Sequence, residues 1–92
     1  MMTVKIKFFA YFRDLFGGRE RELGLGDRST VGDALARLCD TDARRREIFA
    51  GVELKPHLVV MVNGVPVQSL RGPATPLSDG DTLAVFPMLG GG

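Results

Sequence analysis

Residues 3–9 alternate apolar with polar side chains, a pattern that is typical of a strand buried on one face. The apolar positions are Val4, Ile6 and Phe8. After Gly17-Gly18, residues 19–25 begin with alternating arginine and glutamate, which favours a charged edge strand. The two segments predict a hairpin with a wide loop, in which we expect the aromatic stretch 11–16 to be irregular.

The clearest helical pattern begins at residue 31. Apolar side chains recur there at helical spacing, namely Val31, Ala34, Leu35, Leu38 and Cys39. Ser29 or Thr30 can cap this helix, because Asp33 follows Thr30 by three residues as in a capping box. A short second helix is expected over residues 42–49, ended by Gly51.

Residues 57–62 are apolar on both parities, which is typical of a central strand covered on both faces. Asn63-Gly64 then favours a two-residue hairpin turn. Residues 65–67 predict a short edge strand, because Pro66 cannot donate to a central ladder.

The last part of the chain predicts a loop, a turn and a final strand. Residues 68–76 contain a glycine and two prolines and predict the loop. Residues 77–81 predict a tight turn, and residues 82–86 predict the strand, which Pro87 tends to end.

This order of elements excludes a repeating βαβ array and predicts an α+β fold, with a mixed sheet of four to five strands crossed by one main helix. If the first and last strands are neighbours, they run in parallel and place four apolar residues under the helix. These residues are Val4, Ile6, Leu83 and Val85. Phe9, Met61 and Phe86 then look out from the opposite face as an apolar docking patch, unless the loop 68–76 covers it.

The composition fits one small domain of 92 residues. Twelve Lys and Arg against eleven Asp and Glu leave a net charge of +1, so the chain as a whole has no charge signature for nucleic acid or a membrane surface. No apolar run approaches the length of a membrane span. The single cysteine cannot form an internal disulfide, which fits a reducing, cytoplasmic setting.

The sequence lacks the usual arrangements of catalytic and ligand-binding residues. It has no Ser, His and Asp constellation, no glycine-rich phosphate loop before a helix and no cluster of metal ligands. We therefore expect the chain to bind no metal and no cofactor itself, and to catalyse no reaction alone. His57 has no carboxylate or second histidine close in sequence, so we interpret it as facing solvent or a partner.

Two other groups have alternative interpretations. Cys39 lies on the apolar stripe of the predicted helix, which favours a small buried thiol over a nucleophile. Arg44, Arg45 and Arg46 form a basic cluster, which is either a solvated helix face or a site for an acidic partner.

The most unusual chemical feature is the run Gly90-Gly91-Gly92. A segment without Cβ atoms can thread a narrow channel and bring a terminal carboxylate against another reactant. The alternative is a frayed terminus or a linker remnant. A carboxylate is a poor electrophile until it is activated, usually by ATP.

The motif Leu77-Ser78-Asp79-Gly80-Asp81, followed by Leu83-Ala84-Val85-Phe86-Pro87 and the glycine end, resembles the C-terminal signature of ubiquitin-like sulfur carriers. These are the small subunit of molybdopterin synthase and its relatives in thiamine, cysteine and tRNA-thiolation pathways. Residues 4–15 and Val62-Asn63-Gly64 are similar to the same family, so the resemblance spans nearly the whole chain.

The resemblance implies a β-grasp domain over residues 1–87 and a flexible tail over residues 88–92. It implies that Gly92 is adenylated by an E1-like enzyme, which uses ATP, and is converted to a thiocarboxylate, with Gly90 and Gly91 threading the tail. Strand parity and the resemblance together give the expected partner-binding residues, Phe86, Pro87, Met88, Leu89, Phe9 and Met61.

Two positions depart from the family pattern. Met88 stands where the family commonly has a second proline, and Gly90 stands where it commonly has another small residue. We therefore expect a looser tail than is usual in the family.

Three functions follow as hypotheses. The first is a sulfur carrier, in particular the small subunit of molybdopterin synthase, partnered by the large subunit or by another sulfur-accepting enzyme of cysteine, thiamine or tRNA thiolation. The second is a protein modifier that forms isopeptide bonds through Gly92. The third is an interaction module with an inert tail. None of the three involves nucleic acid or a membrane.

Overall fold

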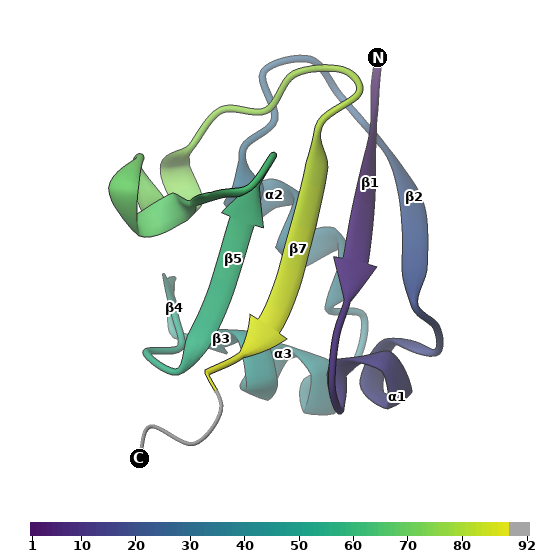
Figure 1. Cartoon of the computed structure of the whole chain (residues 1–92), viewed down its shortest axis with the longest axis vertical. Helices are drawn as coiled ribbons and strands as arrows, with labels where there is room; N and C mark the ends of the chain where they lie inside the picture. The colour runs from purple at the N-terminus through teal and green to yellow at the C-terminus, as the bar shows by residue number, and fades with distance from the viewer. Residues whose placement is uncertain (89–92) are drawn as a thin grey trace.

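The computed structural model describes residues 1–88, which form a five-stranded mixed sheet in the order β2-β1-β7-β5-β6 (Figure 1). The strands are β1 (Met2–Phe8), β2 (Glu20–Leu25), β5 (Leu58–Val62), β6 (Val65–Pro66) and β7 (Thr82–Pro87). Strands β1 and β7 pair in parallel at the centre, and the other pairs are antiparallel. The mixed sheet expected from the sequence is confirmed.

Helix α2 (Val31–Leu38) crosses one face of the sheet, and α3 (Asp42–Ile48) lies on the same side (Figure 1). A short helix, α1 (Phe12–Phe16), follows β1. Two further strands, β3 (Phe49–Ala50) and β4 (Glu53–Leu54), form a separate small sheet. The predicted loop contains two 3-10 turns, η1 (Val67–Ser69) and η2 (Gly72–Ala74).

The core lies between the sheet and the helices. Alternate side chains of β1, β5 and β7 are buried, as the period of two requires. The inward residues that meet the buried stripe of α2 include Val4, Ile6, Leu83 and Val85, as expected. Each is 1% exposed or less, so their burial supplies much of the hydrophobic stabilisation.

The expectation that residues 57–62 form a central strand covered on both faces is wrong. Strand β5 lies next to the edge strand β6, and its outward residues Val59 and Met61 are partly exposed. The helices α2 and α3 cover only the other side. The apolar side chains of β5 on one face therefore pack in the core, and those on the other face belong to the surface patch described below.

The aromatic stretch 11–16 was expected to be irregular and instead forms α1. Phe12 and Phe16 are four residues apart, so both point to the core, where the Phe16 ring stacks on Phe8 with centroids 4.7 Å apart. Gly17 ends the helix with a φ of 78°, a left-handed conformation that favours glycine. A helix of five residues is too short for a visible hydrophobic period.

Of the two candidate capping residues, Ser29 and Thr30, it is Thr30 that caps α2. Its hydroxyl oxygen accepts from the Asp33 N–H at 3.2 Å, and the Asp33 carboxylate accepts from the Thr30 N–H at 2.9 Å. The predicted capping box is therefore confirmed.

At the other end of the helix, burial raises the pKa of the Cys39 thiol to about 11. The thiol stays protonated at neutral pH, which agrees with a structural role.

Between η2 and β7, the segment 77–81 ties the first strand to the last. The Asp79 carboxylate accepts from the Thr3 N–H at 2.7 Å, and the Gly80 N–H donates to the Thr3 carbonyl at 2.8 Å. Gly80 has a φ of 87°, so glycine relieves the strain of this turn.

Asp81 ties the same turn to the β5–β6 hairpin. Its carboxylate accepts from the Ser78 N–H at 2.8 Å and from the Asn63 side-chain amide at 3.0 Å. The amide oxygen of Asn63 in turn accepts from the Thr82 N–H at 3.0 Å. These contacts explain why an Asn-Gly pair and an Asp-Gly-Asp motif occur together in this chain, because each motif supplies partners for the other.

We predict that Asp81→Ala lowers the free energy of unfolding by about 1–2 kcal/mol, because two donors lose their acceptor. Urea denaturation with an unchanged m-value measures this loss. Asp27→Ala is the control, since Asp27 pairs with the N-terminus at a site where both groups are about four-fifths exposed or more. Equal losses in the two variants would show that the Asp81 contacts contribute nothing specific.

Candidate functional site

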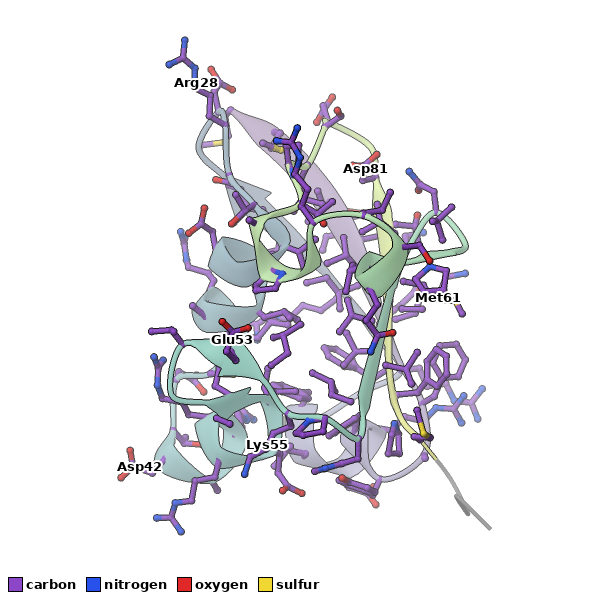
Figure 2. All side chains as sticks on the ribbon, turned by 90° about the vertical axis from the view of Figure 1, so that its left-hand side faces the viewer. Arg28, Asp42, Glu53, Lys55, Met61 and Asp81 are labelled. Carbon is purple, nitrogen blue, oxygen red and sulfur yellow. The ribbon has the colours of Figure 1, made fainter. Side chains whose placement is uncertain are left out.

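The sheet face that points away from the helices carries an apolar patch, here called the open-face patch. Its residues are Phe9, Val59, Met61, Ala84 and Phe86. Val59 lies opposite Phe86, and Met61 lies opposite Ala84. Figure 2 shows Met61 on the side of the sheet away from the helices. The structure thus places Phe9, Met61 and Phe86 on one face, as strand parity predicts.

The predicted loop does not lie on this patch. Its second 3-10 turn packs against α2, where the Pro73 carbonyl oxygen is 3.1 Å from the position that a Cβ at Gly32 would occupy. The alternative in which residues 68–76 cover the apolar face is therefore excluded. Phe9 remains 38% exposed.

Phe9 and Phe86 form the core of the patch. Their rings meet edge to face with centroids 5.8 Å apart, an arrangement that fixes both side chains. Beside them is an open hollow of about 410 Å³, lined by Phe9, Ala10, Phe86 and Pro87. Its lining is almost wholly apolar, so it can receive an apolar side chain of a partner.

A cation flanks this hollow. The guanidinium carbon of Arg13 lies 5.6 Å from the centroid of the Phe9 ring, and its Nε donates to the Phe8 carbonyl at 3.1 Å. Sequence reasoning did not name Ala10, Arg13 or Val59 as site residues. Val59 could have been identified from the sequence, because it is two residues from Met61 and therefore lies on the same face of the strand. Arg13 could not, because helix α1 is what places it against the Phe9 ring.

The end of β7 leads away from the sheet next to the hollow. Pro87 is buried opposite Leu58, so it forms a wall of the hollow more than an exposed contact. The Met88 N–H donates to the His57 carbonyl at 2.7 Å, and the Met88 side chain is 56% exposed. His57 is exposed, in agreement with its expected orientation. Leu89 and Gly90-Gly91-Gly92 lie outside the described residues.

Residues 1–88 contain no group of three or more His, Cys, Asp or Glu side chains that could hold a metal ion. Within the same residues, no helix has the length and hydrophobicity to cross a membrane. What these residues do offer is a surface for recognition at the root of the C-terminal segment.

A mixed five-stranded sheet with parallel first and last strands, crossed by one main helix, defines a ubiquitin-like β-grasp protein. The model of the ThiS family matches residues 6–92, and the chain belongs to this family. Proteins similar to this chain include small archaeal modifier proteins and a putative molybdopterin converting factor subunit.

The chain is 39% identical over 92 residues to small archaeal modifier protein 3 of Haloferax volcanii, covering 99% of this chain and 100% of that protein. The solution structure of the HVO 2177 protein of Haloferax volcanii has a TM-score of 0.88 at 39% identity, covering 99% and 87% of the two chains. A putative molybdopterin converting factor, subunit 1, from Pyrococcus furiosus has a TM-score of 0.76 at 30% identity, covering 95% and 98%.

We predict that Phe86→Ala costs less stability than Val85→Ala, although a larger side chain is removed. Val85 is 0% exposed, so its truncation should lower the free energy of unfolding by about 2 kcal/mol. Phe86 loses mainly its contact with Phe9, worth about 1 kcal/mol. Chemical denaturation of both variants measures the difference. A larger loss for Phe86→Ala would show that its ring belongs to the core.

Proposed function

We propose that the C-terminal carboxylate at Gly92 is activated by an E1-like enzyme and then carries sulfur. ATP supplies the adenylyl group, so the carboxylate becomes an acyl-adenylate and pyrophosphate is released. Hydrosulfide from a sulfide-level donor then attacks the acyl carbon, AMP leaves with the electron pair of the acyl–oxygen bond, and the thiocarboxylate forms. The observation that supports this proposal best is the open-face patch beside the end of β7.

The patch would give the activating enzyme a docking surface within a limited distance of the reacting group. An apolar side chain of the enzyme would fill the hollow between Phe9 and Phe86, with Arg13 at its edge. Four residues beyond Met88 can span at most about 14 Å when extended. The adenylating site must therefore lie within that distance of Met88, and docking positions the carboxylate rather than leaving it to diffusion.

Within this class, we propose that the chain serves as the small subunit of molybdopterin synthase, with the large subunit as the partner that accepts sulfur. The similarity to the Pyrococcus furiosus protein named above supports this branch. The chain itself needs no bound cofactor for this role, since ATP is bound by the activating enzyme. The reaction on this chain is confined to its terminal acyl group.

Protein modification is the second candidate, favoured by the 39% identity to small archaeal modifier protein 3 over the full length of that relative. It begins with the same acyl-adenylate. The acyl group then passes to a lysine amine instead of to sulfur, and an isopeptide bond forms as the activating group leaves. The two functions therefore share the first step and differ in the nucleophile.

We predict that the native chain, incubated with an E1-like enzyme of the same source, ATP and a sulfur donor, exchanges one oxygen of Gly92 for sulfur. Intact-mass measurement detects the exchange. Deletion of Gly92, or the addition of one bulky residue after it, should abolish the change and leave the unfolding curve unaltered. Sulfur incorporation in either altered chain would overturn the assignment of Gly92.

The same proteins separate the two candidates when an extract of the source cells replaces the sulfur donor. Ubiquitin-like conjugates that resist reducing agents and depend on Gly92 would establish modification. Restored molybdopterin synthesis on addition of the large subunit would establish the sulfur-carrier branch. If a chain that is adenylated normally gave neither conjugates nor molybdopterin, both branches would be contradicted.

A further inference from the structure

The basic cluster of α3 does not act as one unit, because Arg44 is turned inward. Its Nε donates to the Leu15 carbonyl at 2.9 Å, and its Nη1 donates to the Asp40 carboxylate at 2.6 Å. The guanidinium carbon also lies 5.6 Å from the centroid of the Phe16 ring. Arg44 therefore joins α3 to α1 and is not available to a ligand.

Arg45 and Arg46 have a different environment. The guanidinium carbon of Arg45 lies 5.2 Å from the centroid of the Phe49 ring, and Phe49 itself packs against the core. Over residues 1–88, the carboxylate ion pairs are Met1 with Asp27 and Arg44 with Asp40, so neither Arg45 nor Arg46 has a carboxylate within 4.0 Å. Phe49 thus orients a guanidinium group whose hydrogen-bond donors remain unused by other side chains.

These side chains line an open groove of about 320 Å³, here called the α3 groove. Its lining is Asp42, Arg45, Arg46, Phe49 and Gly51. Gly51, with a φ of 67°, turns the chain from β3 into β4 and leaves open space where a side chain would be. The groove is large enough for a carboxylate side chain and part of its backbone.

The charges around the groove favour an anion. Asp42 is the acidic group in the lining, and Figure 2 shows it pointing away from the body of the molecule. Glu47, also on α3, lies toward Tyr11, where burial and then the Glu47 carboxylate raise the pKa of the tyrosine. Lys55 lies at the same end of the molecule. The lining of the groove therefore contains two arginines and one carboxylate.

We propose that the α3 groove binds an acidic segment of a partner protein, with a carboxylate held between Arg45 and Arg46. A nucleic acid would need a longer basic surface than this groove, and the net charge of the whole chain is only +1. The mixed lining of two arginines, Asp42 and the Phe49 ring fits a peptide, which brings apolar and charged groups together.

The location of the α3 groove would allow one partner to contact the groove and to hold the C-terminal segment at the same time. Helix α3 and the end of β7 lie at the same end of the molecule (Figure 1). The groove is on the helix side, whereas the open-face patch is on the other side of the sheet. The site is thus separate from the docking surface of the proposed activation, and it does not depend on chemistry at Gly92.

The test is a nuclear magnetic resonance titration of the isotope-labelled full chain with a blocked hexaglutamate peptide. We expect shifts of the Phe49 and Gly51 amides and of the Arg45 Nε, which weaken as salt is raised because the contact is ionic. Arg45→Gln combined with Arg46→Gln should weaken binding at least about fivefold. Arg28→Gln is the matched control, since Arg28 lies at the opposite end of the molecule.

Phe49→Leu keeps an apolar side chain against the core but removes the ring, so it should weaken binding while the chain remains folded. Shifts spread over all basic residues, or an equal effect of Arg28→Gln, would overturn the proposal. Inorganic phosphate is the second probe. If it gave the same shifts at the same concentration, the groove would be a simple anion site and the acidic-segment proposal would fail.

Discussion

The parallel pairing of β1 with β7 is the constraint on which the rest of the structure depends. It brings the first and last strands together at the centre of the sheet, with Ile6 beside Leu83 and Phe8 beside Val85. One residue further, the Phe9 N–H donates to the Val85 carbonyl at 3.2 Å, so Phe9 and Phe86 become neighbours. Two rings that are far apart in the sequence thereby form one surface at the end of the sheet.

The hydrogen bonds at the other end of the sheet hold this register. Asp79 binds the backbone of Thr3, and Asp81 joins its own turn to Asn63, so β1, β5 and β7 are held together at the end of the sheet opposite Pro87. A slip of one residue would move Phe86 into the core and Val85 to the surface. The motif that resembles sulfur carriers in sequence therefore stabilises the fold, and the proposed role of Gly92 would depend on this motif only indirectly.

Much of this arrangement could be predicted from the sequence, because apolar residues recur on the buried faces with a regular spacing. The alternation in β1 was sufficient to predict that strand. The apolar stripe of α2 and the capping box of Thr30 with Asp33 were sufficient to predict that helix. Helix α1 and the roles of the three arginines were not predictable. Phe12 and Phe16 are helical because of their contacts with the core. Arg44 contacts Leu15, Phe16 and Asp40, whereas Arg45 contacts Phe49, and the contacts with Leu15 and Phe16 come from tertiary structure.

We propose that an activating enzyme docks on the open-face patch, beside the end of β7. Amide exchange of the isotope-labelled chain, with and without an E1-like enzyme of the same source, tests it most directly. We expect added protection at Phe9, Val59, Phe86 and Met88, with α2 unchanged. Protection confined to the helices, with the amides of the patch exchanging as they do in the free chain, would contradict it.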